Sequence, residues 1–534
     1  MLKAVSLFTL VAAAVVAAWW RMGVPVEMPA LPINVGDKLP CVSYVPFRGT
    51  QSALNPAARL ESGQIEEDLA ELSKLTECVR TYSVEHGLDR VPDIARKFGL
   101  KVMLGLSVSG DAERTRYQIE VGSGIARRFP DTVRSVVVGS EALSRGEIAP
   151  DALAGMIRTV KARVPMPVTY ADTWEVWLRH PGLAAAVDFV TVHTLPYRER
   201  SPVAAEAAAS HVAAIRKQVA AVFIGKEVMI GEIGWPSAGR MRGAALPSPA
   251  NHARFLHEAV VLGKRETFNI NVREAYDQPW RRAIEGSAGG HWGLLGGAGR
   301  ERKFAWGSSV TNRPHWPWQA AGGVAMAALV FLAGLAGAGR GENAPGLPAW
   351  GAVALNALTA GLLAGWIAEA MIVESFGWTG WLGSLVFAML AVAAALAGSA
   401  AMASRLACPD FSQVLGPVET RPQSPLALTL GLIAIAVTVM ALQAALGLAF
   451  DPVLRDFPFA SLTAAAIPFA LLVLSSPRSV GARPAAETVS AVLLLACAAA
   501  IAWNEDMANW QAMWFCGALL LLALTLLRPR AAPG

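Results

Sequence analysis

Two glutamates each close a short apolar run of the kind that forms a buried parallel strand. Glu141 comes after Ser135–Ser140, and Glu232 comes after Val228–Gly231 and just before the break at Gly234–Ser237. Acids at the ends of parallel strands lie at the mouth of an α/β fold, where substrates and catalytic groups gather. A single acid of this kind is equally well explained as a structural carboxylate bound by loop amides. The pair favours glycoside chemistry, in which one carboxylic acid protonates the leaving oxygen and one carboxylate attacks the anomeric carbon.

Strand-like and helix-like stretches alternate through the region from about Asn34 to Asn312, which has to position these acids. The predicted strands are Cys41–Pro46, Cys78–Ser83, Lys101–Leu106, Val133–Gly139, Pro167–Ala171, Asp188–His193, Glu227–Gly231 and Phe268–Tyr276. The predicted helices between them include Gln64–Leu75, Val91–Phe98, Arg114–Arg128, Asp151–Arg163, Ala204–Val219 and Asn251–Leu262. This alternation and length predict an α/β fold, a (β/α)8 TIM barrel, with the two acids at the ends of the fourth and seventh strands.

The two acid motifs also carry a family resemblance. Val138-Gly139-Ser140-Glu141 and Gly231–Ser237 resemble glycoside hydrolase family 17, the β-1,3-glucanase and β-1,3-glucanosyltransferase family, in its bacterial membrane-anchored form associated with β-glucan synthesis. The resemblance runs from about Cys41 to about Trp306. It implies a retaining enzyme in which Glu141 is the acid/base and Glu232 the nucleophile.

Further blocks at the predicted strand ends are similar to that family and imply a set of substrate-binding residues. Aromatic rings suit a barrel mouth because a pyranose presents C–H groups to a π-face. We expect Tyr44, Tyr197 and Trp235 to be the better candidates for stacking, with core packing as the equal alternative for any one ring. The full implied set is Tyr44, Arg80, Tyr82, Ser140, Asp172, His193, Tyr197, Trp235, Glu274 and Trp280.

Two positions depart from the family pattern. Ser140 stands where the family usually has the Asn that reaches the substrate 2-hydroxyl, so that contact is lost, water-mediated or supplied by another residue. Cys41 replaces a usual Gly and is expected to affect packing at the start of its strand. Cys41 and Cys78 begin adjacent predicted strands, so a disulfide between them is one alternative. Cys408, Cys497 and Cys516 are expected to be small buried apolar residues.

The composition divides the chain into two kinds of sequence. Of the 534 residues, 54% are hydrophobic and only 16% are charged, which is too apolar for an ordinary soluble protein. All histidines and lysines lie before Asn343. We therefore predict an N-terminal signal anchor or signal peptide at 1–20, with the anchor favoured, a catalytic barrel at 34–312 and a seven-span transmembrane domain at 320–527. The expected spans are Ala320–Gly339, Ala349–Val373, Trp381–Ala403, Leu426–Phe450, Phe457–Leu474, Val489–Trp503 and Trp510–Leu527.

Arginines follow alternate apolar spans, and the positive-inside rule assigns their loops to the cytoplasm. These arginines are Arg340, Arg405, Arg421, Arg478, Arg483, Arg528 and Arg530. The pattern predicts a multi-pass protein of the bacterial inner membrane with a periplasmic barrel and a cytoplasmic C-terminus. Glu369 and Gln443 are polar exceptions within the spans, and Glu369 is expected to reach the membrane interface.

The remaining signals exclude other classes of function. The formal charge of +5 comes without a basic stripe with interleaved aromatics, so we expect no nucleic-acid partner. The chain lacks C-x-x-C, H-E-x-x-H and Gly-rich phosphate motifs, so we expect no metal and no other cofactor.

We therefore expect an enzyme that acts on β-1,3-glucan chains through a covalent intermediate and transfers them to a sugar hydroxyl, thereby branching, elongating or cyclising them. The expected partners are a β-glucan oligo- or polysaccharide, the lipid bilayer and a membrane glucan synthase. Alternatives are an endo-β-1,3-glucanase, a non-catalytic glucan-binding scaffold for a synthase, and a transporter with a sugar-binding domain. The last is disfavoured because the spans hold few polar residues.

Overall fold

The computed structural model describes residues 2–29, 38–340, 344–451, 454–475 and 483–528. The chain separates into two compact units. One consists of Val26–Gly239 and Ala244–Val310, and the other of Met1–Pro25, Arg240–Gly243 and Thr311–Gly534. The first predicted boundary, Asn34, lies outside the described residues. The barrel unit is instead closed on itself by an antiparallel bridge between Val26 and Val310.

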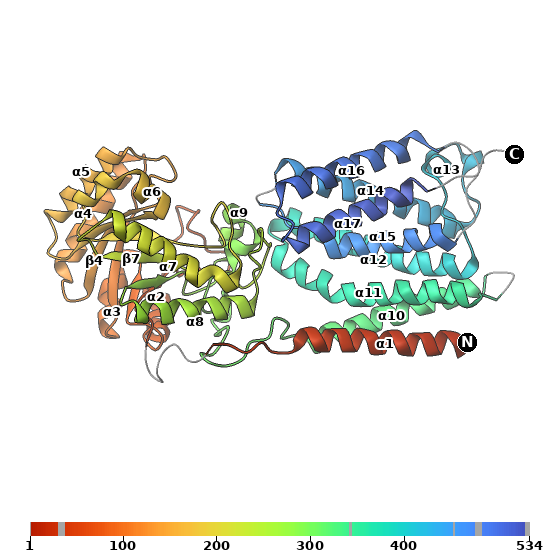
Figure 1. Ribbon diagram of the computed structural model, residues 1–534, viewed down its shortest axis with the longest axis horizontal. Helices are drawn as coiled ribbons and strands as arrows, with labels where there is room; N and C mark the ends of the chain where they lie inside the picture. Colours follow the sequence, from red (N-terminus) through yellow and green to blue (C-terminus); the bar gives the residue numbers. More distant parts are fainter. Residues whose placement is uncertain (1, 30–37, 341–343, 452–453, 476–482, 529–534) are drawn as a thin grey trace. The chain divides into compact units, whose positions relative to one another are not determined.

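The first unit is a closed barrel of parallel strands in chain order, which confirms the predicted (β/α)8 fold. Its strands are β1 (Val42–Ser43), β2 (Cys78–Arg80), β3 (Lys101–Leu106), β4 (Val133–Ser140), β5 (Val168–Thr173), β6 (Val190–His193), β7 (Val228–Ile233) and β8 (Ile270–Val272). Helices cover the outside of the strands (Figure 1). These are α2 (Ser62–Leu72), α3 (Val91–Lys97), α4 (Ala112–Arg128), α5 (Pro150–Lys161), α6 (Trp174–Arg179), α7 (Ala205–Val222) and α8 (Pro249–Arg265).

Burial explains why these runs form strands and helices. Strand β7 is buried at every position, as expected for a parallel strand covered on both faces. Helix α5 buries only Leu153, Ile157 and Val160, which share one face at helical spacing. The largest differences from prediction are at β1 and β8, which are shorter than Cys41–Pro46 and Phe268–Tyr276. At both strands the chain leaves the ladder early and forms the loops of the barrel mouth.

Cys41 and Cys78 form a disulfide at the start of β1 and β2. Both are fully buried in a cluster inside the barrel with Met103, Val137 and Met229. The disulfide therefore links neighbouring strands at the end of the barrel opposite the mouth.

The second unit is all-helical. Its apolar helices are α1 (Leu2–Gly23), α10 (Trp316–Ala338), α11 (Leu347–Glu374), α12 (Gly377–Ser404), α14 (Pro425–Phe450), α15 (Phe459–Ser475), α16 (Ala485–Asn504) and α17 (Trp510–Leu526). Six of them are long and apolar enough to cross a membrane, and α15 and α17 are shorter, at 17 residues each. A short helix, α13 (Phe411–Leu415), lies between α12 and α14.

Helix α1 packs into this unit and does not stand alone. Val15 and Trp19 are fully buried, and Trp19 contacts Trp366 of α11. The polar exception Glu369 is ion-paired with Arg313 and accepts a hydrogen bond of 3.0 Å from Gln319. Glu369 therefore has partners from the segment that leads into α10, whereas Gln443 is exposed.

One polar contact inside this unit was not predicted. The buried amide of Asn356 on α11 donates to Ala395 O and Ser399 Oγ of α12, both at 2.8 Å. Hydrogen bonds between apolar helices satisfy the amide where no water is available.

Candidate active site

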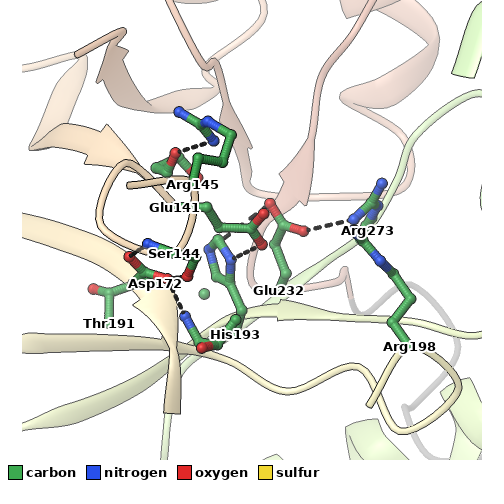
Figure 2. Close-up of polar contacts among 12 residues, drawn as sticks. Glu141, Ser144, Arg145, Asp172, Thr191, His193, Arg198, Glu232 and Arg273 are labelled. Carbon is green, nitrogen blue, oxygen red and sulfur yellow. Dashed lines mark hydrogen bonds and ion pairs between the residues drawn. The ribbon is translucent and has the colours of Figure 1, made fainter. Parts of the chain in front are cut away.

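The two predicted catalytic glutamates meet at the mouth of the barrel. Glu141 directly follows β4, and Glu232 is the next-to-last residue of β7, not the last as predicted. Their carboxylate oxygens and a ring nitrogen of His193 all lie within 4.8 Å of one another. Figure 2 shows the two carboxyl groups turned toward each other beside the His193 ring.

The backbone at Glu141 is unusual. Glu141 has a φ of 56°, in the left-handed region that non-glycine residues seldom adopt, and Gly139, two residues earlier, has a φ of 85°. The amide of Glu141 donates to Ala171 O at 2.8 Å, which fixes the turn against β5. Such backbone conformations gather at functional sites, where the surrounding structure holds them.

His193 contacts both acids from the end of β6. Its Nδ1 lies 2.9 Å from Glu141 Oε1, and its Nε2 lies 3.3 Å from Arg80 Nη1. Because a guanidinium only donates, Nε2 must accept, so the ring is neutral with its proton on Nδ1. His193 thus donates to Glu141 through a fixed tautomer.

Glu232 is held as a carboxylate by donors on both of its oxygens. Oε1 accepts from the Tyr82 hydroxyl at 2.7 Å and lies 3.6 Å from Arg80 Nη1, and Oε2 lies 3.2 Å from Arg273 Nη1. Burial raises the pKa of Glu232, but its interactions with His193, Arg273 and Arg80 outweigh burial and lower the pKa below its ordinary value. Glu232 is therefore ionised and suited to nucleophilic attack.

Glu141 is more accessible, with 24% of its side chain exposed against 5% for Glu232. Burial raises the pKa of Glu141. The hydrogen bond from His193 and the charges of Arg198 and Arg273 lower the pKa by more than burial raises it, so the net shift is downward. The free site therefore holds both carboxyls ionised. Covering Glu141 with a sugar removes its remaining water and shifts its pKa upward, toward a proton-donating form.

Arg80 is the buried centre of this polar cluster. It is 1% exposed, donates to Gly231 O at 2.7 Å and to Ser140 Oγ at 3.1 Å, and its guanidinium lies 4.8 Å from the centre of the Tyr82 ring. The departure at Ser140 therefore gives this residue an arginine partner. Its predicted role toward a substrate 2-hydroxyl stays a prediction.

Asp172 supports the loop that carries Glu141. Its carboxylate accepts hydrogen bonds from the hydroxyls of Ser144 and Tyr170 and from the Ser144 amide at 3.3 Å. Since Asp172 is fully buried, these contacts hold the segment after β4 in place. Its predicted contact with substrate stays a prediction.

The three aromatic residues favoured for stacking are buried. Tyr44 is fully buried, and its hydroxyl donates to Asp68 at 3.2 Å. Trp235 is also fully buried and packs against Phe255, and its indole N–H donates to a backbone carbonyl. Tyr197 is 5% exposed and packs edge-on against Trp235. These are the surroundings of core rings, which was the alternative interpretation. Sugar stacking by these residues stays a prediction.

The remaining two predicted residues lie beside β8. Glu274 is 1% exposed and pairs with Arg281 at 3.2 Å, and burial raises its pKa. Trp280 is partly exposed, and its ring lies edge-on to Phe47 with the Arg281 guanidinium 4.9 Å from its centre. Trp280 is thus one of the predicted aromatic residues that keeps some exposed surface at the mouth.

Sequence reasoning missed three charged residues around Glu232. Arg273 directly follows β8, Glu285 ends the short helix α9 (Arg282–Glu285), and Arg198 follows β6. Arg273 joins Glu232 to Glu285, and Arg198 lies 3.8 Å from Glu285. The available signal was the charge of Arg273 at the end of a predicted strand next to Glu274.

The donor atoms of Glu141, His193 and Glu232 are close enough together to ligate a cation. However, Glu232 is already neutralised by Arg80 and Arg273, and His193 Nδ1 carries a proton toward Glu141. A cation at this point would meet two guanidinium groups, so the electrostatics of the site disfavour a metal.

Comparison with known proteins agrees with this geometry. The family model of the BtgE/BtgC glycoside hydrolase domain matches residues 41–293. The chain is 29% identical over 276 residues to the probable β-glucosidase btgE of Aspergillus flavus, a match that covers 50% of this chain and 44% of that protein. It is 25% identical over 253 residues to a glucan 1,3-β-glucosidase of Candida albicans, covering 43% of this chain and 82% of that one.

Among solved structures, the chain is similar to the glycoside hydrolase family 17 β-1,3-glucanosyltransferase of Rhizomucor miehei. The identity is 25%, the match covers 50% of this chain and 98% of that one, and the TM-score is 0.43. The chain spans less than half of the length of the Aspergillus relative, and the family model matches within the barrel region. The resemblance to β-1,3-glucan enzymes predicted from the two acid motifs is confirmed, because residues 41–293 match the BtgE/BtgC glycoside hydrolase domain and the chain is similar to a glucan 1,3-β-glucosidase.

Proposed function

We propose that this protein is a retaining enzyme of β-1,3-glucan that transfers glucan chains to a sugar hydroxyl. The observation that carries the proposal is the separation of Glu141 and Glu232, whose nearest oxygens lie within 4.8 Å. Retaining glycosidases keep their carboxyls about 5–5.5 Å apart, whereas inverting enzymes need about 6.5–9.5 Å to admit a water.

In the first step, Glu232 attacks the anomeric carbon while the bond to the leaving oxygen breaks. Glu141 gives its proton to that oxygen, so the first sugar chain leaves as an alcohol and the second stays bound to Glu232 as an ester. His193 orients Glu141 throughout, because its Nδ1–H points at the carboxyl.

In the second step, Glu141 takes the proton of an incoming hydroxyl, whose oxygen attacks the anomeric carbon and releases Glu232. A sugar hydroxyl gives transfer, and water gives hydrolysis. Trp280, with its partly exposed ring, offers apolar surface for a sugar near this point. Hydrolysis by the same residues is the second candidate, and the similarity to the Candida glucan 1,3-β-glucosidase favours it.

We further propose that the helical unit spans a membrane with the barrel outside the cytoplasm. Exposed tryptophans lie near the ends of α1 and α16 and near the starts of α10 and α12, as in an interfacial aromatic belt. They are Trp20, Trp318, Trp378 and Trp503, with 58%, 80%, 78% and 89% exposure. The arginines used for the topology prediction lie at the opposite helix ends. They outnumber Arg21, Arg313 and Arg455 at the tryptophan ends, and the positive-inside rule assigns the arginine-rich ends to the cytoplasm. The described ones are Arg340, Arg405, Arg421, Arg483 and Arg528, whereas Arg478 and Arg530 lie outside the described residues.

Two more observations support this topology. The disulfide between Cys41 and Cys78 suits an oxidising compartment such as a periplasm. Helix α1 is packed into the helical unit through Val15 and Trp19, which supports a retained anchor over a cleaved signal peptide. A bacterial inner membrane and a neighbouring glucan synthase remain part of the proposal.

The test uses the full-length protein in detergent micelles with linear β-1,3-gluco-oligosaccharides, followed by mass spectrometry. Products longer than the starting oligomer, absent in Glu232→Gln, support transfer. Shorter products alone support hydrolysis. Oligosaccharide binding without turnover by a folded protein overturns both and favours the scaffold.

A further inference from the structure

Arg273 connects the nucleophile to a charged cluster beyond the barrel. It directly follows β8, and its side chain is 3% exposed. Its Nη1 lies 3.2 Å from Glu232 Oε2, and its Nη2 donates to both oxygens of Glu285 at 2.8 and 3.0 Å. One guanidinium is thus shared between two carboxylates, with the shorter contacts on Glu285.

Glu285 is itself held by several arginines from different parts of the chain. Arg281 lies at 3.1 Å and Arg198 at 3.8 Å, in addition to Arg273. Burial raises the pKa of Glu285, but these three guanidinium groups outweigh burial and lower its pKa to about 2. Glu285 is therefore ionised and competes with Glu232 for Arg273.

The two oxygens of Glu232 are held differently. Oε1 has the short bond from Tyr82 and the nearby Arg80, whereas Arg273 is the contact at Oε2 among the described residues. An oxygen that attacks an anomeric carbon has to turn a lone pair away from its partner. Oε2, which has the single and longer contact, is the oxygen suited to do so.

We propose that Arg273 is a positioning residue whose guanidinium is divided between Glu285 and Glu232, so that Glu285 sets how firmly the nucleophilic oxygen is held. The proposal deepens the proposed retaining mechanism and rests on it. Arg273 donates two of its hydrogen bonds to Glu285 and one to Glu232. Its charge keeps Glu232 ionised and oriented, and the single contact leaves Oε2 able to reach the anomeric carbon.

The charged groups around this pair come from several strands. Besides Arg273, the groups facing Glu232 are Arg80, Tyr82, His193, Glu141 and Glu274. Besides Glu232 and Glu285, the charged and titratable groups facing Arg273 are Glu141, Glu274, Arg281 and Tyr82. Removing Arg273 takes a cation from Glu232, and its pKa must rise. Removing the charge of Glu285 leaves Arg273 wholly to Glu232, whose pKa must fall while Oε2 becomes more tightly held.

The experiment measures kcat/KM on linear β-1,3-gluco-oligosaccharides between pH 2 and pH 8 with the full-length protein. We expect Arg273→Gln to move the acidic limb to higher pH by at least about one pH unit. Glu285→Gln should leave the limb at or below that of the natural protein while lowering kcat about tenfold. Arg273→Lys should restore part of the profile, because it restores the charge.

The double variant Arg273→Gln with Glu285→Gln is decisive. If Glu285 acts through Arg273, the double variant has the profile of Arg273→Gln alone. Arg114→Gln is the matched control. This half-exposed arginine on α4 also forms an ion pair with a glutamate, Glu85. Its profile should equal that of the natural protein. Additive effects in the double variant, or limbs that move in the same direction in both single variants, overturn the proposal.

A second readout does not depend on turnover. Carbodiimide coupling of glycinamide to Glu232, followed by peptide mass spectrometry, measures how much of this carboxyl is protonated at each pH. If the oligosaccharides are not turned over but the labelling of Glu232 follows the same order among the variants, the proposed function fails and the role of Arg273 stands. Unchanged labelling in Arg273→Gln, with an unchanged thermal unfolding midpoint, overturns that role.

Discussion

His193 Nδ1 lies 2.9 Å from Glu141 Oε1, and the proton between them belongs to the imidazole. That assignment follows from the other ring nitrogen, which accepts from Arg80 at 3.3 Å. The acid/base candidate is thus oriented by a ring whose tautomer is set from the far side of the site.

Replacing His193 should therefore disturb Glu141 more than substrate binding. We expect His193→Phe, which keeps a ring but has no donor, to lower kcat roughly 10²-fold with a smaller change in KM, because the acid loses its orienting donor. Loss of that hydrogen bond also raises the pKa of Glu141, so the basic limb of the kcat profile should move to higher pH. A loss confined to KM would contradict this role.

Removing the carboxyl of Glu141, the proposed acid/base, should leave Glu232 able to attack the anomeric carbon. We expect Glu141→Ala to lose about 10²–10⁴-fold in kcat/KM on oligosaccharides. An aryl glucoside with a good leaving group needs no protonation, so it should lose far less. Added azide should then yield a β-glucosyl azide of retained configuration, detectable by NMR. An α-configured product would rule out retention.

The barrel should lose stability below neutral pH through His252. Burial and the charge of Lys303 lower the pKa of this fully buried ring to about 4, from an ordinary value of 6.5. The unfolded chain binds the proton first, so stability falls as the pH drops from about 6.5 to about 4 and then levels off. The loss amounts to about 3 kcal/mol.

The check is the thermal unfolding midpoint of the full-length protein at several pH values. His252→Asn keeps a donor for the carbonyl of Trp235, 2.5 Å from Nδ1, and removes the titrating ring. Its midpoint should be flatter between pH 6.5 and pH 4 than that of the natural protein. Equal slopes would assign the acid sensitivity to other groups.

The disulfide should stabilise the barrel without affecting the site. It closes a loop with a sequence separation of 37 residues, for which a contribution of about 2–4 kcal/mol is typical. We expect the double variant Cys41→Ala with Cys78→Ala to unfold at a temperature about 5–10 °C lower. The control is Cys516→Ala, which removes a thiol in the helical unit. An unchanged midpoint for the barrel transition would argue against any stabilising role.

The proposed topology predicts which loops face the outside of the cell. In a chain whose free cysteines Cys408, Cys497 and Cys516 are replaced by serine, Ala508→Cys should react with an impermeant maleimide on intact cells. Thr420→Cys should react with the maleimide only after the membrane has been permeabilised. Both positions are exposed, so access alone does not separate them. The reverse labelling pattern would mean that the protein has the opposite orientation in the membrane.

The sequence predicted the barrel well because parallel strands buried on both faces give continuous apolar runs. Strand β3 has the predicted bounds, and β4 differs by one residue. Helix α6 was not anticipated, because Trp174–Arg179 is too short to show a helical period. The two candidate catalytic acids could be located because each lies at the end of such a run.

The charged cluster around the nucleophile was not predictable in the same way. Arg273, Glu285 and Arg198 come from three loops whose meeting depends on how the barrel closes, and no short motif joins them. The burial of Trp235 was not predictable either. A tryptophan that follows a strand gives the same sequence pattern whether its ring faces a sugar or packs against a core residue such as Phe255.

Helix α1 packs against α10 and α11, yet the whole of 26–310 separates it from them along the chain. A ribosome adding about 5–20 residues per second needs about 15–60 seconds to make that stretch. During this interval the partners of Trp19 do not exist. Under the proposed topology, α1 is therefore the barrel's single membrane anchor while the eight strands are made and close. The remaining helices pack around α1 only after they have been synthesised.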